Sequence, residues 1–456
     1  MSYDSAVAQM YALGHELAQM PAHKFDLTHM RVLLAALGHP ENRVASVLIA
    51  GTNGKGSTAA TLASILEASK LKTGLYTSPH LISINERIRI DGHPIIDPDF
   101  TRAHDEVEKV AERLVAKGDL PWHPSFFEML TAMAFEHFAR VHPDMVVLEV
   151  GMGGRLDATN VVEPRVSVIT DIALDHQKYL GTTVGEIARE KVGIIRPGAA
   201  VVTLPQSPEA NAVIGHAILD CGAHAINAVP YVPPVSPGSD SYLSADRSGG
   251  AERSTRLRLR YPLQVMGERI EVDTPLIGRH QLRNIALAIA AAEELHNQGL
   301  NKITPASIER GIRATHWPGR FQVLPAKGRE PEYVFDVAHN PAGAWALRST
   351  MSAVYGDRPI TMVFGVMRDK AVSEIAEILF PIAEHVIATQ ADNPRSATPD
   401  EIRQAASRVA TDIQAADNVA SALEKARRGA GPGGLAVITG SIYIVGEAMR
   451  VLGVRI

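Results

Sequence analysis

Several features that would narrow the function of a protein are scarce in this sequence of 456 residues. It contains one cysteine, Cys221, which excludes an internal disulfide and a Cys-rich zinc site and fits a reducing compartment. Basic and acidic residues number 45 and 50, a formal net charge of -5, and neither sign forms a long run. This balance does not indicate nucleic acid or an anionic membrane as a partner.

Long apolar stretches are also missing. Residues 44–50 form an apolar run, but a membrane span needs about 20 such residues. The first residues include Asp4 and Glu16 and lack the basic start and apolar stretch of a secretory signal, so we expect a cytoplasmic protein. The length exceeds one ordinary core, which favours two domains with a site between them.

Alternating extended and helical patterns predict α/β architecture in both halves. Strands are predicted at 44–50, 75–77, 145–150, 166–170 and 200–204, with helical spacing at 57–70, 127–141 and 184–191. The sequence Trp317-Pro318-Gly319-Arg320 interrupts the series, and further strands are predicted at 333–337, 360–364, 385–389 and 435–439. This alternation favours mostly parallel sheets. The Pro- and Gly-rich residues 231–255 predict short antiparallel hairpins.

The strongest motif is the glycine-rich run Gly51-Thr52-Asn53-Gly54-Lys55-Gly56-Ser57. Its glycines let backbone N–H groups point at one anion, the following helix adds its positive end, and the lysine adds a full charge. The strict phosphate-loop pattern fails twice, because Ile49 occupies the first glycine position and Gly56 separates Lys55 from the hydroxyl of Ser57. The strand-loop-helix context nevertheless favours ATP binding by Thr52, Asn53, Gly54, Lys55, Gly56 and Ser57 over a turn with a solvated lysine.

This run resembles the loop of folylpolyglutamate and dihydrofolate synthases, members of the Mur ligase superfamily. Other segments resemble that family in the same order along the chain: Thr77-Ser78-Pro79-His80-Leu81, Asn85-Glu86-Arg87, residues 148–160, Ala173-Leu174-Asp175-His176, Arg189-Glu190-Lys191, His280-Gln281-Leu282-Arg283-Asn284, Pro318-Gly319-Arg320-Phe321, residues 335–341 and Thr439-Gly440-Ser441.

The resemblance implies a fold and an activity. A P-loop ATPase domain with a mostly parallel sheet and a small antiparallel subregion is expected over 1–317, a hinge over 318–328, and a smaller Rossmann-like glutamate-ligase domain over 329–456. The implied reaction is ATP-dependent addition of L-glutamate to folate or folylpolyglutamate, and also to dihydropteroate, through an acyl phosphate. We expect a monomer acting on small molecules.

The resemblance also implies a magnesium site, with Ser78, Glu149 and His176 as ligands and the histidine suggesting a second Mg²⁺. Each residue lies at or just after the end of a predicted strand, where open α/β sheets bind ligands. Burying Glu149 without a partner would be costly, whereas a histidine is more often structural. For Lys191 the resemblance implies a carbamylated lysine that helps to organise the metal site. Its spacing alone predicts an ordinary helix-surface lysine.

Three further positions resemble the ATP contacts of the family: Asn284 for adenine, Arg320 for phosphate, and Asp336 for ribose or a nearby donor. Their ordinary alternatives are a helix cap, a surface salt bridge and a strand-end turn. Arg320 lies on the predicted hinge, so domain closure would bring it to the γ-phosphate, and His339 would act in the same closed site. Lys191, His339 and Arg320 are therefore the predicted catalytic residues.

Folate-like acceptors need a slot for an aromatic ring. The segments that resemble the pterin-binding regions of the family are Lys24, Phe25, Asp26 and Leu27, then Phe126, Phe127 and Glu128, then Leu156, Asp157 and Ala158. The two phenylalanines fit a helix core equally well.

A folylpolyglutamate synthase without activity on dihydropteroate remains an alternative, and three functions outside this family can be compared with the sequence. A muramyl ligase carries an extra domain before the loop, and the 50 residues before Gly51 are too few for one. A P-loop NTPase that drives conformational change, or an inactive nucleotide-binding module, would leave Lys191, Asp336 and His339 without a shared purpose. Phosphate release that depends on both glutamate and folate distinguishes the ligase from these alternatives.

Overall fold

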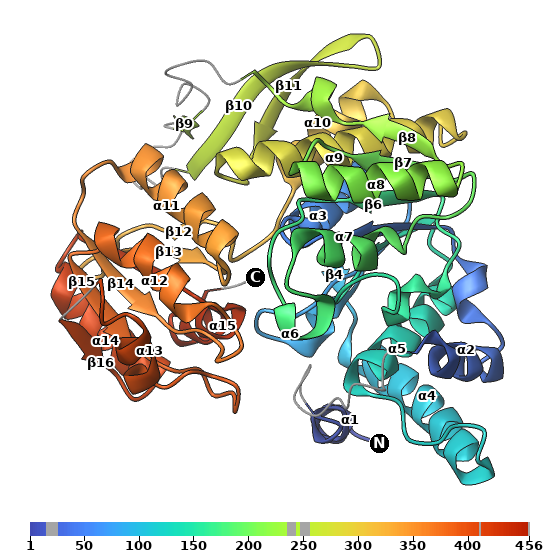
Figure 1. Ribbon diagram of the computed structural model, residues 1–456, viewed down its shortest axis with the longest axis horizontal. Helices are drawn as coiled ribbons and strands as arrows, with labels where there is room; N and C mark the ends of the chain where they lie inside the picture. The colour runs from blue at the N-terminus through green and yellow to red at the C-terminus, as the bar shows by residue number, and fades with distance from the viewer. Residues whose placement is uncertain (15–25, 235–242, 247–255, 410–411, 455–456) are drawn as a thin grey trace.

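The computed structural model describes residues 1–14, 26–234, 243–246, 256–409 and 412–454. Two large β-sheets, each covered by helices, form two lobes that lie side by side, and the C-terminal lobe is drawn in orange and red in Figure 1. The predicted combination of a mostly parallel sheet, a small antiparallel subregion and a second α/β sheet is confirmed. No described helix is both long and apolar enough to cross a bilayer.

The first sheet has eight strands in the order β4-β3-β2-β5-β1-β6-β7-β8. The run from β2 to β8 is parallel, and β3 and β4 continue it antiparallel at one edge. The strands are β1 (Ser46–Ala50), β2 (Thr73–Tyr76), β3 (Ile88–Ile90), β4 (His93–Pro94), β5 (Met145–Glu149), β6 (Val166–Ile169), β7 (Ala200–Thr203) and β8 (His224–Asn227).

Helices cover both faces of this sheet, and its central strands β1, β5 and β6 are accordingly buried along their whole length and mostly apolar. Along β1, Val47 and Ile49 belong to one core cluster, whereas Leu48 and Ala50 belong to the other. The first cluster contains α3 (Lys55–Ala68), α9 (Arg279–Asn297) and α10 (Pro305–Ala314). The second contains α1 (Tyr3–Ala12), α2 (Leu27–Ala36), α4 (Asp97–Lys117), α5 (Phe126–Val141), α7 (Val184–Val192) and α8 (Pro208–Asp220).

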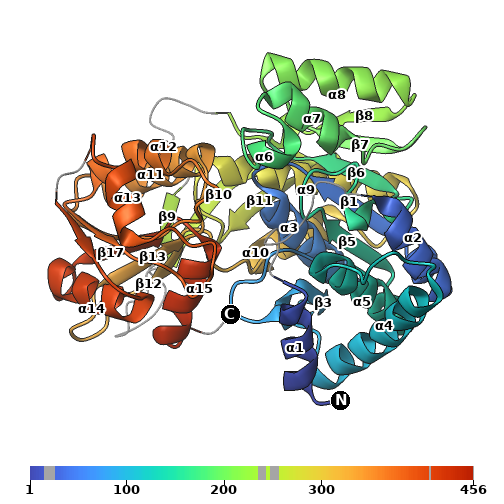
Figure 2. The same cartoon turned by 60° about the horizontal axis from the view of Figure 1, so that its bottom comes forward.

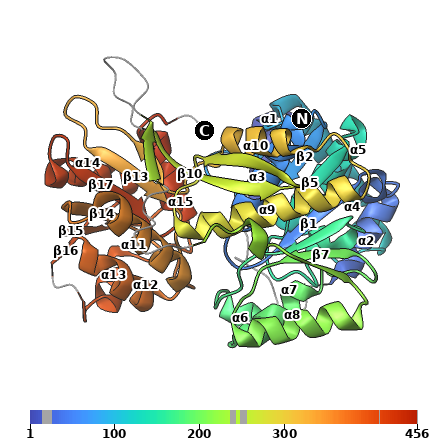
Figure 3. The same ribbon diagram turned by 90° about the horizontal axis from the view of Figure 1, so that it is seen from above.

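A three-stranded antiparallel sheet of β9 (Leu243–Asp246), β10 (Arg256–Val265) and β11 (Glu268–Thr274) packs beside α10 (Figure 3). The sequence placed this subregion within 231–255, which is wrong for its two longer strands. Met266 and Gly267 both have positive φ and close the tight turn between β10 and β11, a hairpin signal that the Pro- and Gly-rich stretch obscured. Part of the predicted range lies outside the described residues.

The second large sheet has the order β12-β13-β17-β14-β15-β16, parallel except for β12. The carboxyl ends of its parallel strands lead into the face that meets the first lobe (Figure 2). Its strands are β12 (Gln322–Leu324), β13 (Glu332–Asp336), β14 (Ile360–Phe364), β15 (His385–Ala388), β16 (Ile413–Ala415) and β17 (Leu435–Thr439), and its helices are α11 (Pro341–Tyr355), α12 (Val372–Leu379), α13 (Pro399–Ala405), α14 (Val419–Ala430) and α15 (Ile442–Val451).

Candidate active site

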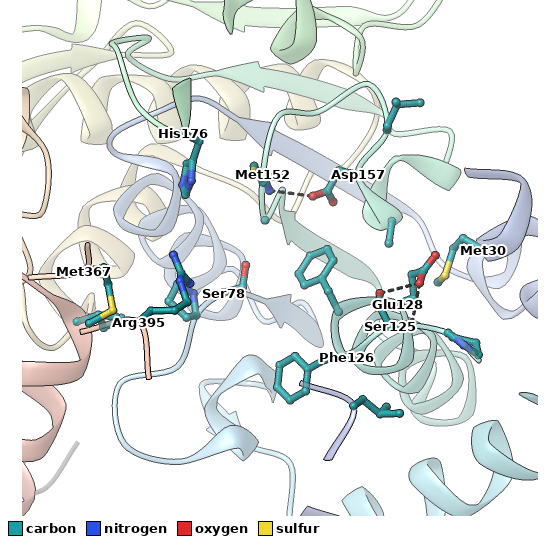
Figure 4. A pocket seen from close by; sticks show the side chains of 18 of the residues that line it. Met30, Ser78, Ser125, Phe126, Glu128, Met152, Asp157, His176, Met367 and Arg395 are labelled. Carbon is teal, nitrogen blue, oxygen red and sulfur yellow. Dashed lines mark hydrogen bonds between the residues drawn. The ribbon is translucent and has the colours of Figure 1, made fainter. Parts of the chain in front are cut away.

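A cavity of about 460 Å³ lies between the lobes and is lined by residues from both. One side, which we call the apolar wall, comes from the first lobe; the opposite side, the charged wall, draws most of its cations from the second. In Figure 4, Phe126 and Met30 lie on one side of the cavity, and Arg395 lies on the other. The apolar wall consists of Leu27, Met30, Phe126, Phe127, Met152, Leu156 and Ala158, and the charged wall of His176, Arg320, His339, Lys370 and Arg395.

The glycine-rich loop follows β1 and leads into α3, as the sequence predicted. A Cβ on Gly51 would lie 1.8 Å from the Thr170 hydroxyl oxygen, and one on Gly54 would lie 2.1 Å from Asn284 Oδ1. Gly54 also has a left-handed φ of 90°. Both positions therefore require glycine, and Asn284 is held against the loop.

Asn284 is not a helix cap, because it lies inside α9 and is 3% exposed. Its amide donates to Gln281 Oε1 at 2.8 Å, which leaves Oδ1 facing Gly54. At the other end of the loop, a Cβ on Gly56 would lie 2.8 Å from the ring of Trp317, and Ser57 is buried in the first turn of α3. The loop is thus enclosed by residues from far along the chain.

Two lysines converge on one carbonyl of the loop. Lys55 Nζ lies 3.1 Å from the Gly51 oxygen, and Lys191 Nζ lies 2.8 Å from the same atom. Lys191 is 3% exposed, so the alternative of a solvated helix-surface lysine is wrong. Burial, followed by the charge of Lys55, lowers the pKa of Lys191 to about 7. The lowered pKa raises the share of neutral amine at neutral pH, and the neutral amine is the form that reacts with carbon dioxide.

Arg320 is fixed by the backbone on either side of it. The Gly319 carbonyl accepts from Val337 N at 3.0 Å, and Phe321 N donates to the Asp336 carboxylate at 2.9 Å. Asp336 also accepts from Ala338 N at 2.9 Å, so this residue both forms the strand-end turn and holds the backbone next to Arg320. Burial lowers the pKa of Arg320, and the nearby charges of Asp336 and Glu149 oppose that shift. This environment differs from that of a surface salt bridge.

The predicted metal ligands follow parallel strands of the first sheet: Ser78 follows β2 and Glu149 ends the neighbouring β5, whereas His176 follows β6, which lies on the far side of β1. Ser78 N donates to Glu149 Oε2 at 3.2 Å, and Glu149 is 5% exposed at the end of β5. His176 Nδ1 is buried and has no hydrogen-bond partner among the described residues. Burial lowers the pKa of His176 to about 3, which keeps the ring neutral, as metal binding requires. These donors fit a metal ion.

The part of the chain that the structure describes contains no cluster of three or more His, Cys, Asp or Glu side chains suited to a metal. A cation bound beside Glu149 would therefore draw on the Ser78 hydroxyl, on phosphate oxygens and on water. Mg²⁺ commonly binds in this way, with one or two carboxylates and several waters.

The sequence missed a set of contacts centred on Asp175, which joins the lobes. Lys370 Nζ donates to Asp175 Oδ1 at 2.6 Å, Asn340 donates to Oδ2 at 3.3 Å, and His339 Nε2 lies 3.5 Å from the same oxygen. Burial opposes ionisation of Asp175, but the His339 hydrogen bond and the charge of Lys370 hold its pKa well below the usual range. Asn340 also donates to Asn53 Oδ1 at 3.0 Å. Asp175 therefore connects the charged wall to the loop lobe.

The sequence contained a signal for the residues that were missed, Asn340, Lys370 and Arg395. Asn340 directly follows His339, and Lys370 and Arg395 occur in loops after β14 and β15, so all three follow the carboxyl ends of parallel strands. Arg395 is held by Asp369 at 2.7 Å.

The residues predicted to bind the acceptor differ in their surroundings. Asp26 caps α2 by accepting from Thr28 N at 2.8 Å, and Glu128 caps α5 by accepting from Ser125 N at 2.8 Å, so both carboxylates already have partners. Asp157 accepts from Met152 N at 3.0 Å, and burial raises its pKa. Phe126 belongs to the core and also lines the cavity. Leu27, Phe127, Leu156 and Ala158 line the cavity as well, whereas Lys24 and Phe25 lie outside the described residues.

Comparison with known proteins assigns the class. The Mur ligase middle domain matches residues 127–292, and the Mur ligase glutamate ligase domain matches residues 319–442. Both large lobes are thus those of an ATP-dependent Mur-type ligase.

Full-length relatives narrow this class to one family. The chain is 34% identical to the dihydrofolate synthase/folylpolyglutamate synthase of Bacillus subtilis, over 94% of this chain and 95% of that protein. It is 34% identical to the folylpolyglutamate synthase of Lacticaseibacillus casei, over 99% of both. The Mycobacterium tuberculosis folylpolyglutamate synthase solved with ADP and AMPPCP superposes with a TM-score of 0.83 at 32% identity, covering 99% of both chains. The chain belongs to the folylpolyglutamate/dihydrofolate synthase family.

Proposed function

We propose that this ligase adds L-glutamate to folate or folylpolyglutamate and also to dihydropteroate, in an ATP-dependent reaction that passes through an acyl phosphate. The main support is the cavity with unlike walls: the apolar wall suits a flat ring system, and the charged wall suits carboxylates and phosphate. The proposal keeps the predicted division of the chain, with residues 1–317 for ATP, 318–328 as the hinge and 329–456 for glutamate.

In the proposed reaction, an oxygen of the acceptor carboxylate attacks the γ-phosphorus of ATP and ADP leaves. The amine of glutamate then attacks the acyl carbon, phosphate departs, and the nitrogen loses a proton as the amide forms. Lys55 from the first lobe and Arg320 from the hinge neutralise the phosphates, and Asn284 faces the loop where it can contact the adenine. Asp336 fixes Arg320 through the amide of Phe321, so closure of the lobes positions the cation.

His339 is placed to act on the amine or on its proton. Its Nδ1 lies 2.9 Å from the Val337 carbonyl, so this nitrogen carries hydrogen and Nε2 faces Asp175 and the cavity. Lys370 and Arg395 supply the positive charges that two glutamate carboxylates require, and each is restrained by an aspartate. The ammonium of glutamate must become a neutral amine before it attacks.

Ser78, Glu149 and His176 are the proposed Mg²⁺ ligands. The bound ion would offset phosphate charge and orient the oxygens that react. Lys191 is the proposed site of carbamylation, because its amine is buried and readily deprotonated. The modification would replace two like charges at the Gly51 carbonyl with an ion pair between a carbamate and Lys55. A monomer in the cytoplasm remains our prediction.

The acceptor distinguishes the proposal from its nearest alternative, an enzyme restricted to folates. The B. subtilis relative is named for both activities and the L. casei relative for one. The purified protein is incubated with ATP, labelled glutamate and either dihydropteroate or tetrahydrofolate, with Arg320→Gln as the inactive control. Label is expected in both acceptors; label in tetrahydrofolate alone restricts the activity to folates.

Phosphate release tests the reaction class. Release is expected to require both acceptor and glutamate. A rate of ATP hydrolysis that is indifferent to both would instead identify an NTPase and overturn the ligase proposal.

A further inference from the structure

The phosphate loop is held in place by a neighbouring segment, residues 170–173, at the carboxyl end of β6. The amides of Thr52 and Asn53 both donate to the Asp171 carbonyl, at 2.8 and 3.1 Å. The Thr52 hydroxyl donates to the Ala173 carbonyl at 3.0 Å, and the Ala173 amide donates back to that hydroxyl at 3.1 Å. The conformation of the loop therefore depends on where residues 170–173 lie.

Two side chains outside the loop fix this segment. Arg283, on α9, forms a bidentate ion pair with Asp171: Nη2 lies 2.6 Å from Oδ1, and Nε lies 3.0 Å from Oδ2. Gln206, which follows β7, accepts from Ile172 N at 2.7 Å and donates to the Thr170 carbonyl at 3.0 Å. Arg283 also donates to the Pro205 carbonyl at 2.9 Å. We call Asp171, Gln206 and Arg283 the loop brace.

Arg283 has a second relation to the loop, because it precedes Asn284 on α9. Asn284 Oδ1 occupies the space beside Gly54, so the loop is supported by Asn284 on one side and by residues 170–173 on the other. The Arg283–Asp171 pair joins these two supports. A bidentate guanidinium-carboxylate pair fixes orientation as well as distance, so it sets how far α9 stands from the end of β6.

We propose that Arg283 and Asp171 are positioning residues for the nucleotide, because their ion pair sets the spacing between the phosphate loop and Asn284. Neither residue belongs to the lining of the cavity. Their side chains are 32% and 36% exposed, and ion pairs this exposed contribute little to folding stability. Loss of the pair is therefore expected to lower the affinity for the nucleotide and to leave the folding stability nearly unchanged. This inference rests on the proposed nucleotide site and is independent of the acceptor.

The test measures binding of AMPPCP to the full chain by calorimetry. Arg283→Gln and Asp171→Asn are each expected to raise the Kd about fivefold, while Tm changes by less than about 2 °C. Arg283→Lys keeps the charge but loses the bidentate geometry and should give a smaller increase. Since both single variants break the same pair, the double variant should bind no more weakly than the weaker single variant. The KM for the acceptor should stay unchanged in all of them.

Arg140→Gln is the matched control, because Arg140 is 38% exposed and pairs with Glu106 and Glu136 on α4 and α5, away from the loop. It should bind AMPPCP like the parent. The inference is overturned if both brace variants bind like the parent, if their Tm falls together with their affinity, or if the control loses as much affinity. A parent protein that binds AMPPCP without glutamylating any folate contradicts the proposed function, while the comparison of variants still decides the role of the brace.

Discussion

The two walls of the cavity are built on different principles. The apolar wall is one edge of the core of the first lobe: Phe126, for example, begins α5, is 4% exposed and belongs to that core, so the wall exists whether or not the lobes meet. The charged wall takes Lys370 and Arg395 from the second lobe, and Lys370 finds its counter-ion, Asp175, only across the gap. Under the proposed function, this difference makes recognition of the acceptor ring a property of one lobe and makes the reaction depend on both.

The largest expected effect is at the meeting point of the two lysines. Lys191→Ala should lower kcat/KM about a thousandfold, because it removes a charged group beside the phosphates. Lys191→Arg should be about as inactive, since a guanidinium does not take up carbon dioxide. If a carbamate is the active form, added acetate or formate should partly restore the steady-state activity of the Lys191→Ala variant. Full activity of Lys191→Arg would contradict this role.

A smaller but sharper effect is expected at the contact between lobes. Asp175→Asn removes the counter-ion of Lys370 and should lower kcat by roughly tenfold to a hundredfold, because the charged wall is then misplaced. Affinity for the acceptor should change little, since the apolar wall is intact. Asp369→Asn, which removes one counter-ion of Arg395 within the second lobe alone, is the control.

Small-angle X-ray scattering separates closure from local chemistry. A larger radius of gyration is expected for Asp175→Asn and an unchanged one for Asp369→Asn. Equal values for both variants would mean that Asp175 does not hold the lobes together.

A change in the apolar wall should affect the KM for the acceptor, whereas a change at the contact between the lobes affects kcat. Phe126→Leu is expected to raise the KM for the acceptor roughly tenfold, through the loss of aromatic contact, with the KM for ATP unchanged. Phe135→Leu is the matched control, since Phe135 is a fully buried residue of the same helix that does not line the cavity. It should lower Tm and leave the acceptor KM unchanged. If both variants raise the acceptor KM equally, the cause is the loss of core packing and not the loss of contact with the acceptor.

The smallest effect concerns the stability of the protein at low pH, which depends on His280, a partly buried histidine near the positive charge of Arg320. Burial, followed by the charge of Arg320, lowers the pKa of His280 to about 4. Between this value and the unfolded value near 6.5, the unfolded state binds more protons, so the free energy of unfolding falls as the pH falls through that window. His280→Gln should remove up to ~2 kcal/mol of this decline, measured by urea unfolding at pH 7 and pH 4.5. Identical declines in both proteins would contradict the pKa shift.

Local pattern was sufficient for much of the fold. The apolar runs at 145–150 and 435–439 became β5 and β17 because strands buried on both faces need no polar side. The turn at Met266 and Gly267 was missed, since the Pro- and Gly-rich stretch before it gave a stronger loop signal.

The phosphate loop shows which features follow from local sequence and which depend on the tertiary structure. The sequence by itself determined that glycines and a lysine lie between a strand and a helix, because backbone conformation and chain order are local properties. It left open whether Lys191 is a surface residue, since helical spacing shows which residues share a face but not what covers that face. Only the tertiary structure decided that Lys191 is buried against Gly51, that Asp175 gathers residues of the second lobe, and that Arg283 braces the loop. Each of these contacts joins residues more than a hundred positions apart, and such pairs are set by how the sheets and helices pack.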